Sequence, residues 1–580
     1  MDKKKQMVTV SQLFKSLILA QIIANITPSL ANISNGLLIG NSLSPTAMAA
    51  LSFVAPTGGL FAAIASVISL GANIMCGNYM GRGENEKVEK VFTTAIVSLL
   101  AIGGALTLYT ECFTENVASL LGAEGEALPE TIEYLRGLCL GIIPTLLVPC
   151  LVVFLNMANE IMHAMMSTLV LAIVNLLVGF VNLRLMQGGM FGMGLASAIS
   201  EAVAFVFLLY KFIKKKDLVR LKKDGFVPGF VLRIIILGSP SALMFFLYSI
   251  RNIQINTLTF DVGGTQAVTA LGILSSSAGI FDAVNTGIGS TLVMLASVMA
   301  GEEDRESLKK LAYYALTFGG ILVILKTGLF AALAHPIVNI FAAEGTDKAL
   351  AVKCIYYYAA CMPFNLIPMV LIKTYQCLNR VFFSNVCYVF TCIIFPIGIM
   401  RVLGPIYGID GVWTCYYLTE ILTILMLFIV CFIKSGRFPK TMGDWLWLNK
   451  TFEVLPDNQL SATISNENEI EDICLDIREF LIKKGIGLEK SAQAEAYVEK
   501  IADYIINGQN ISGPDKKKKY PEVIDILASI KEDELLIRFR DNYVPCDSSE
   551  EIRNSIIGDG DIKELKYQLT FGMNILSLKM

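Results

Sequence analysis

The stretch Lys211-Phe-Ile-Lys-Lys-Lys-Asp-Leu-Val-Arg-Leu-Lys-Lys223 carries seven basic residues between two long apolar parts of the chain. Loops rich in lysine and arginine stay on the cytosolic side of a membrane. The apolar parts before and after it also resemble one another. We therefore interpret residues 211–228 as a cytosolic loop that joins two copies of one membrane unit, residues 1–210 and 229–436.

Composition changes near residue 440. Of the 580 residues, 54% are hydrophobic and 17% are charged, and a mixed, soluble composition is confined to the last part of the chain. We expect a linker at 437–460 and a cytosolic α+β domain at 461–580. The 13 scattered cysteines show no metal-ligand spacing, so no metal site is expected. The basic residues lie in loops between apolar runs, which excludes a nucleic-acid partner.

Twelve segments are long and apolar enough to cross a bilayer, which takes about 20 residues as a helix. The fold class is therefore an all-α polytopic membrane protein with twelve transmembrane helices in two pseudo-symmetric six-helix bundles. Basic residues gather on alternate loops, which places both termini in the cytosol. The expected segments are 14–40, 51–79, 90–113, 134–158, 163–186, 192–213, 230–257, 267–299, 309–333, 350–376, 382–403 and 411–433.

Loop residues recur at a nearly constant spacing along the two halves. Apolar helices resemble one another by chance, but loops at one constant offset do so far less often. Parallel repeats of this kind are typical of transporters, with the binding site between the repeats. Three pairs are 220 positions apart and the fourth 219: Gly81 with Gly301, Glu124 with Glu344, Asn159 with Asn379, and Glu201 with Glu420.

Several stretches resemble the MATE-type transporters of the multidrug/oligosaccharidyl-lipid/polysaccharide exporter superfamily. They are Ile39-Gly-Asn-Ser-Leu-Ser-Pro-Thr-Ala-Met-Ala-Ala-Leu51, Gly81-Arg-Gly-Glu84, Gly192-Met-Gly-Leu-Ala196 and Gly408-Ile-Asp-Gly-Val412. The resemblance implies a V of two bundles around a central cavity in a bacterial plasma membrane. It implies export of cationic or amphipathic compounds against a proton or sodium gradient, with no cofactor and no enzymatic activity.

Ionisable residues within membrane segments are costly, so they mark candidate transport residues. Asp282, among small polar residues, is the best candidate for a functional acid, and a static ion pair with Arg251 or Lys326 is the alternative. Glu201 and Glu420 occupy matching positions, where a helix cap or an interhelical hydrogen bond is the alternative. The in-span set is Glu201, Asp282, Glu420, Arg251, Lys326 and Lys373.

Two asparagines depart from the family pattern. Asn35 and Asn182 stand where many members carry an aspartate. An asparagine can bind sodium through its carbonyl oxygen but cannot take up a proton. We therefore expect coupling to depend on Glu201 or on the second half of the chain, or to be absent.

The tail has helical periodicity at 471–482 and 491–506 and strand patterns at 534–540 and 573–578. It resembles the ATP-binding domain of anti-sigma-factor kinases, which are related to histidine kinases. The resemblance assigns Glu499, Asp503 and Asp541 to ATP and magnesium binding. Tyr543 replaces a family glycine and the glycine-rich lid is reduced to 558–560, so kinase activity is not expected.

Three functions remain open. The first is a MATE-like antiporter that exports xenobiotics and carries a regulatory tail. The second is a membrane signalling receptor whose degenerate transporter unit controls the anti-sigma-like domain. The third is a lipid-linked oligosaccharide flippase. The expected partners are a small molecule, the lipid bilayer and a regulatory protein of the tail, and the basic stretch 211–223 is the expected docking site of the tail.

Overall fold

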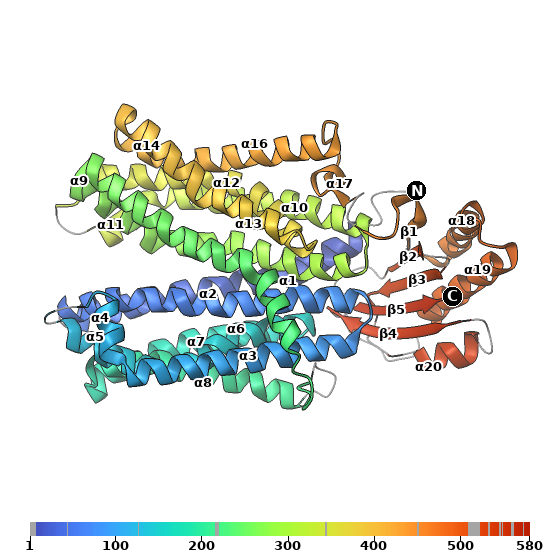
Figure 1. The fold of residues 1–580 in the computed structure, drawn as a ribbon, viewed down its shortest axis with the longest axis horizontal. Coiled ribbons are helices and arrows are strands. Elements are labelled where there is room, and N and C mark those ends of the chain that lie inside the picture. Colours follow the sequence, from blue (N-terminus) through green and yellow to red (C-terminus); the bar gives the residue numbers. More distant parts are fainter. Residues whose placement is uncertain are drawn as a thin grey trace.

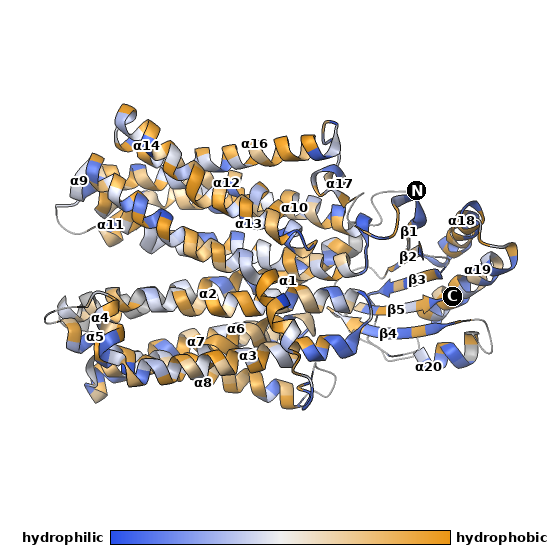
Figure 2. Cartoon of the chain, in the orientation of Figure 1, coloured by the Kyte–Doolittle hydropathy of each residue, from blue (hydrophilic) through white to orange (hydrophobic). Residues whose placement is uncertain are grey.

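The computed structural model describes residues 7–42, 45–123, 125, 127–214, 220–342, 345–448, 452–508, 523–531, 534–543, 547, 549–557, 562–571 and 573–580. Two groups of long helices lie side by side, and a small sheet domain sits at one end of them (Figure 1). Apolar residues run along the helices, whereas polar residues gather in the sheet domain and the loops nearest to it (Figure 2).

The first half consists of helices only. They are α1 (Met7–Ser42), α2 (Pro45–Gly81), α3 (Asn85–Cys112), α4 (Thr114–Leu120), α5 (Ala127–Cys139), α6 (Ile142–Met157), α7 (Ile161–Val181), the π-helix η1 (Asn182–Met186) and α8 (Gly189–Lys214).

The second half repeats this order. Its helices are α9 (Pro228–Gly301), α10 (Arg305–Ala332), α11 (Ala334–Phe341), α12 (Lys348–Cys377), α13 (Val381–Val389), the π-helix η2 (Phe390–Ile394), α14 (Phe395–Tyr407), α15 (Ile409–Trp413), α16 (Cys415–Ser435) and the short α17 (Met442–Trp445).

Among the described residues, ten helices are long and apolar enough to cross a membrane, or eleven if the pair α5 and α6, bent by 49°, forms one span. Helix α9 has 74 residues, which would make about 110 Å of straight helix against a bilayer core of about 30 Å. Gly264 interrupts it with φ 63° and ψ −164°, a backbone conformation that glycine alone adopts readily. Helix α9 thus consists of two pieces, each of membrane-spanning length.

The repeat is visible in the backbone itself. Helices α3 and α10 begin at residues 85 and 305 and end at 112 and 332, an offset of 220 at both ends. Residues with positive φ recur with the same spacing: Gly83 and Glu303, Gly125 and Gly345, Asn159 and Asn379. The two halves therefore share turn geometry as well as helix lengths.

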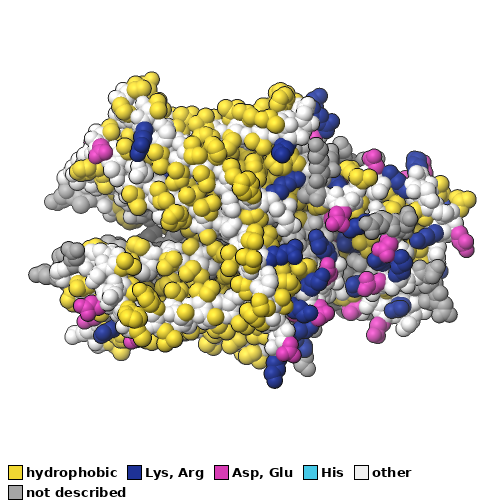
Figure 3. Space-filling model, viewed as in Figure 1, with side chains coloured by type: hydrophobic (Ala, Val, Ile, Leu, Met, Phe, Trp, Pro, Cys, Tyr) yellow, Lys and Arg dark blue, Asp and Glu magenta, His cyan; other side chains and the backbone are white. Residues whose placement is uncertain are grey.

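The two halves touch closely at the end nearest the sheet. A Cβ atom at Gly81 would overlap the carbonyl oxygen of Val298, and one at Gly301 would overlap that of Asn78. These contacts are reciprocal, because 78 and 81 differ from 298 and 301 by 220. At the opposite end a furrow separates the two lobes (Figure 3).

Residues just after the last span belong to the packed membrane part. Leu446 and Leu448 are fully buried in the main hydrophobic cluster. The Tyr375 hydroxyl donates to the Trp445 carbonyl (2.6 Å), and Arg380 donates to the carbonyls of Leu446 (2.8 Å) and Trp447 (3.1 Å). The chain therefore leaves the helical core only after residue 448.

The tail is a five-stranded antiparallel sheet in the order β1-β2-β3-β5-β4. Its strands are β1 (Gln459–Ile464), β2 (Ile524–Lys531), β3 (Glu534–Asp541), β4 (Glu564–Thr570) and β5 (Met573–Lys579), and its longer helices are α18 (Ile470–Lys483) and α19 (Leu488–Gly508). The sequence predicted both helices and strands β3 and β5, but not β1, β2 or β4. Alternate side chains of β3 lie on opposite faces of the sheet. Ile537 and Phe539 pack in the tail core, while Arg538 and Arg540 face the bundles.

The docking of the tail on the basic stretch 211–223 stays a prediction. Lys211 pairs with Glu160 (3.0 Å) and Lys222 with Glu89 (2.8 Å), both on the helical part. Residues 215–219, which include two of the seven basic residues, lie outside the described part of the chain. The tail contacts the α9–α10 loop, the α2–α3 loop, α1 and the end of α6.

Candidate functional site

A chain of polar side chains crosses the interior of the second bundle. Asn365 on α12 donates to Glu420 Oε1 on α16 (3.0 Å), and Asn285 on α9 donates to Asn365 Oδ1 (3.1 Å). Glu420 and Asn285 are 5% and 8% exposed. Among the described residues, Glu420 Oε2 and Asn285 Oδ1 accept no hydrogen bond. A buried acceptor without a hydrogen-bond donor costs free energy. This row of hydrogen-bonded side chains can therefore bind a cation or a proton.

Asp282 lies one turn before Asn285 on the same helix. Its carboxylate accepts a hydrogen bond of 2.6 Å from the Tyr358 hydroxyl on α12. Lys326 on α10 donates to the Phe281 carbonyl (3.1 Å), and its charge acts on Asp282 without a direct ion pair. Asp282 is thus held by a neutral partner next to a buried base.

Arg251 completes the cluster from the first piece of α9. Its guanidinium lies over the ring of Tyr248, 4.3 Å from the centroid, and its buried Nε has no hydrogen-bond acceptor among the described residues. Its charge acts on both Glu420 and Asp282. The structure thus brings together four of the five second-half candidates, Arg251, Asp282, Lys326 and Glu420. The fifth, Lys373 on α12, lies against Gly289 of α9.

The first-half candidates lie apart from this cluster. Asn182, in η1, is buried and donates to the Gly189 carbonyl (3.1 Å), so it fixes the turn between α7 and α8. Glu201 on α8 is half-buried and its Oε2 has no partner among the described residues. Asn35 lies in α1, but its side chain is outside the described part of the structure.

Sequence reasoning missed Asn285 and Asn365. Two signals were available. Asn285 follows Asp282 by three residues, which places both on one helix face. Asn365 stands between Pro363 and Pro368 in α12, where prolines interrupt the regular backbone hydrogen bonds.

The proposed nucleotide residues of the tail lie on two elements, α19 and the end of β3. Glu499 and Asp503 lie one turn apart on the exposed face of α19, and Asp503 accepts from Asn507 (2.7 Å). Asp541 is buried at the end of β3. It accepts from Asn574 Nδ2 (2.7 Å) and from the Tyr543 amide (3.1 Å). Burial, only partly offset by these two hydrogen bonds, raises the pKa of Asp541 to about 6.

Binding of ATP and magnesium by the tail stays a prediction. Asp541 Oδ1 accepts both of these hydrogen bonds from within the tail. Among the described residues, no group of three or more histidine, cysteine or acidic side chains could hold a metal ion. Residues 558–560, the reduced lid, lie outside the described part.

Comparisons with known proteins identify the family and several relatives of this protein. The MatE family model matches residues 20–181 and again residues 240–400, together more than half of the chain. The multidrug export protein MepA of Staphylococcus aureus is 21% identical over 435 residues, which are 74% of this chain and 95% of MepA. The probable multidrug resistance protein YoeA of Bacillus subtilis is 23% identical over 339 residues, 56% of this chain and 72% of YoeA.

Solved structures match the fold. An outward-facing multidrug resistance MATE family transporter has a TM-score of 0.69 at 18% identity, covering 74% of this chain and 97% of that one. A transporter of the same superfamily from Pyrococcus furiosus has a TM-score of 0.67, also at 18% identity, and covers the same shares. These relatives are transporters, not enzymes, and about a quarter of the chain is unmatched in them. The doubled family match and the shared fold show that the chain belongs to the MatE family of multi-pass membrane transporters.

Proposed function

We propose that the chain is a secondary-active antiporter that exports cationic or amphipathic small molecules across a bacterial plasma membrane. The names of its relatives MepA and YoeA, which denote multidrug export and resistance, support this substrate class. Twelve spans follow if α9 is divided at Gly264 and the bent pair α5 and α6 is one span. An even number of spans puts both termini on the same side of the membrane. The basic loops identify that side as the cytosol.

The observation that carries the proposal is the buried chain Glu420–Asn365–Asn285 with its two unsatisfied oxygen atoms. A coupling proton or sodium ion can bind there, and so can the ammonium group of a substrate. If both compete for one site, binding of the ion drives release of the substrate, as antiport requires. Arg251 keeps a positive charge near Glu420 and so limits how strongly any cation is held.

Efflux measurements test this coupling site. Cells that express Glu420→Gln should retain ethidium and norfloxacin in both imposed proton and imposed sodium gradients, whereas the wild type extrudes them. Asp261→Asn, an exposed acid on the same helix as Asn285, is the matched control and should export normally. Full efflux by Glu420→Gln would remove this carboxylate from the mechanism.

A signalling receptor is the second candidate. It is supported by the buried contact between Arg540 of the tail and Glu302 of the helical part, which physically joins the two. If the protein is a receptor, the wild type should show no gradient-dependent efflux of ethidium or norfloxacin. A ligand should then change the hydrogen exchange of the tail. Gradient-dependent efflux would exclude it.

A further inference from the structure

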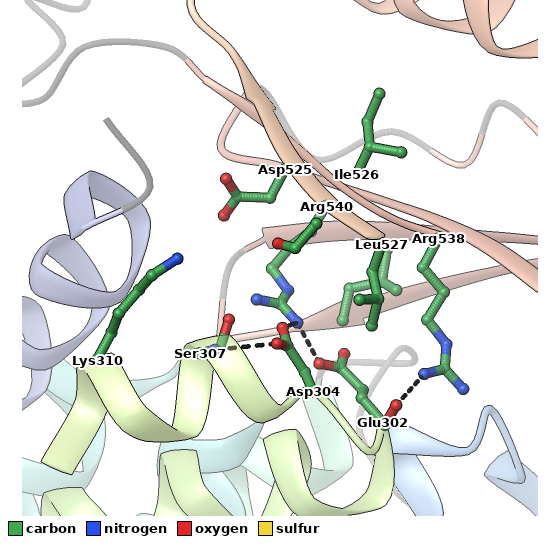
Figure 4. Close-up of a pocket in the computed structure, with 11 residues that line it drawn as sticks. Glu302, Asp304, Ser307, Lys310, Asp525, Ile526, Leu527, Arg538 and Arg540 are labelled. Atoms are coloured by element: carbon green, nitrogen blue, oxygen red, sulfur yellow. Dashed lines mark hydrogen bonds and ion pairs between the residues drawn. The ribbon is translucent and has the colours of Figure 1, made fainter. Parts of the chain in front are cut away.

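The sheet holds the second bundle through arginines of β3. Arg540 pairs with the Glu302 carboxylate and lies 3.6 Å from Asp304 Oδ2, and Arg538 donates to the Glu302 carbonyl (2.7 Å; Figure 4). Glu302 and Asp304 are each 3% exposed, and Arg540 is 8% exposed. Removing one member of such a buried set leaves an unpaired charge, so this contact is costly to break.

The start of the sheet is fixed to the same loop. Gln459, the first residue of β1, donates to the Glu303 carbonyl (2.9 Å) and accepts from Arg305 (2.8 Å). Arg305 also donates to the carbonyls of Leu448 (3.3 Å) and Val454, so it ties the linker to the beginning of α10. The α9–α10 loop is therefore bonded to two separate strands.

The sheet meets the first bundle mainly through the hairpin between β4 and β5, and Asn542 after β3 also donates to Gln12 on α1 (3.0 Å). Phe571 and Met573 are 7% and 4% exposed and pack in the hydrophobic cluster of the helical part. The Phe571 amide donates weakly to the Met157 carbonyl at the end of α6 (3.4 Å). Lys566 of β4 lies beside Gly83 in the α2–α3 loop. This contact is mainly apolar and carries no buried ion pair among the described residues.

Both contacts lie directly beside the place where the bundles touch. Glu302 follows Gly301, whose backbone meets Asn78, and Gly83 lies two residues after Gly81, whose backbone meets Val298. One rigid sheet therefore spans the closed end of the two lobes.

We propose that the sheet domain is a latch across the two bundles: while docked on both, it holds the sheet end of the transporter closed. Opening of that end requires the hairpin tip at Phe571 to leave α6, and the sheet then travels with the second bundle. The contact to the first bundle breaks first, because the charged contact to the α9–α10 loop costs more free energy to break than the apolar contact to α6. The role of this step in transport rests on the proposed function, but the latch itself does not.

Hydrogen exchange of the full-length protein in nanodiscs tests the latch without transport. Phe571→Ala should speed exchange of the backbone amides at 78–82 and 298–302 by about tenfold or more, which corresponds to about 1.4 kcal/mol. Leu475→Ala is the matched control, because Leu475 is 52% exposed on α18 and should change nothing at those amides. Phe571→Leu keeps an apolar tip and should give an intermediate effect even if the alanine variant folds poorly.

The outcomes separate the two proposals. If the hairpin 564–579 exchanges faster in Phe571→Ala while 78–82 and 298–302 stay as slow as in the wild type, the bundles close without the sheet and the latch is wrong. If both regions exchange faster and the wild type exports neither ethidium nor norfloxacin, the latch stands and the proposed substrate class fails.

Discussion

Single glycines set how closely the two halves approach each other. Gly81 and Gly301 each place their backbone against a carbonyl oxygen of the other half, where a side chain does not fit. Because the interior is close-packed, the neighbouring helix would have to move to admit even a methyl group. The closed end thus depends on two residues with no side chain.

Gly81→Ala should lower the stability of the whole protein by about 1–3 kcal/mol, because the added methyl overlaps the Val298 carbonyl. Thermal unfolding in detergent measures this effect. Gly104→Ala on α3 is the control: a Cβ there meets nothing within 4 Å, so the variant should be neutral or slightly stabilising. Equal melting temperatures for the two variants would contradict the close approach.

Asp541 predicts a pH dependence of the tail. Its pKa is about 6 in the folded tail, against an ordinary 3.8, because it is buried. The folded state therefore binds more protons than the unfolded state between these values, so the tail loses stability as the pH rises from about 4 to about 6. Hydrogen exchange of β3 in the full-length protein should be faster at pH 7.5 than at pH 5, after correction for the intrinsic rate.

Asp541→Asn should remove most of this pH dependence and slow the exchange at pH 7.5. Asp476→Asn, an exposed acid on α18, should leave it unchanged. An unaltered pH profile in Asp541→Asn would show that another group titrates.

At the scale of elements, the sequence predicted most of the helices and also the break in α9, because Gly264 lies between the expected spans 230–257 and 267–299. Long apolar runs predict spans reliably because a bilayer admits little else. The 49° bend between α5 and α6 left no comparable signal, and it lies inside the single expected span 134–158. Strands β1, β2 and β4 were missed because their interior faces form only by pairing with distant segments, and short alternating runs such as Gln459–Ile464 look like a linker.

Gly264 gives the test for this scale. Gly264→Ala should destabilise the protein by about 1–3 kcal/mol although the site is open, because a side chain is strained at φ 63° and ψ −164°. Gly272→Ala on the same helix has ordinary helical angles and open space, so it should not be destabilising. Melting temperatures in one detergent compare the two, and a stable Gly264→Ala would mean that α9 is continuous at this point.

For the whole molecule, charge is distributed unequally between two halves of matching shape. At an offset of 220, Asp282 and Lys326 correspond to Ala62 and Leu106, and Tyr358 corresponds to Leu138. Of the charged members of the cluster, only Glu420 has an acidic partner, Glu201, which lies 219 positions earlier. The sequence alone identified the charged members of the cluster, because charges in apolar spans are conspicuous. It could not identify the neutral Asn285 and Asn365, whose role depends on which helices are neighbours.

The end of the helical part also belongs to this scale. A chain that ends after residue 451 should melt several degrees higher than one that ends after residue 436. The shorter chain lacks Leu446 and Leu448, which are fully buried, and burial of one leucine is worth about 2 kcal/mol. Similar melting temperatures for both truncations would place the boundary earlier.

Because Arg305 fastens the linker at Leu448 and Val454, the sheet cannot diffuse far from its docking place even when the hairpin has come free. Such tethering gives an effective concentration on the order of millimolar. Rebinding is then intramolecular and independent of how much protein the cell makes. A soluble competitor that keeps the sheet undocked must therefore either reach that concentration or bind the released hairpin much more tightly than α6 does.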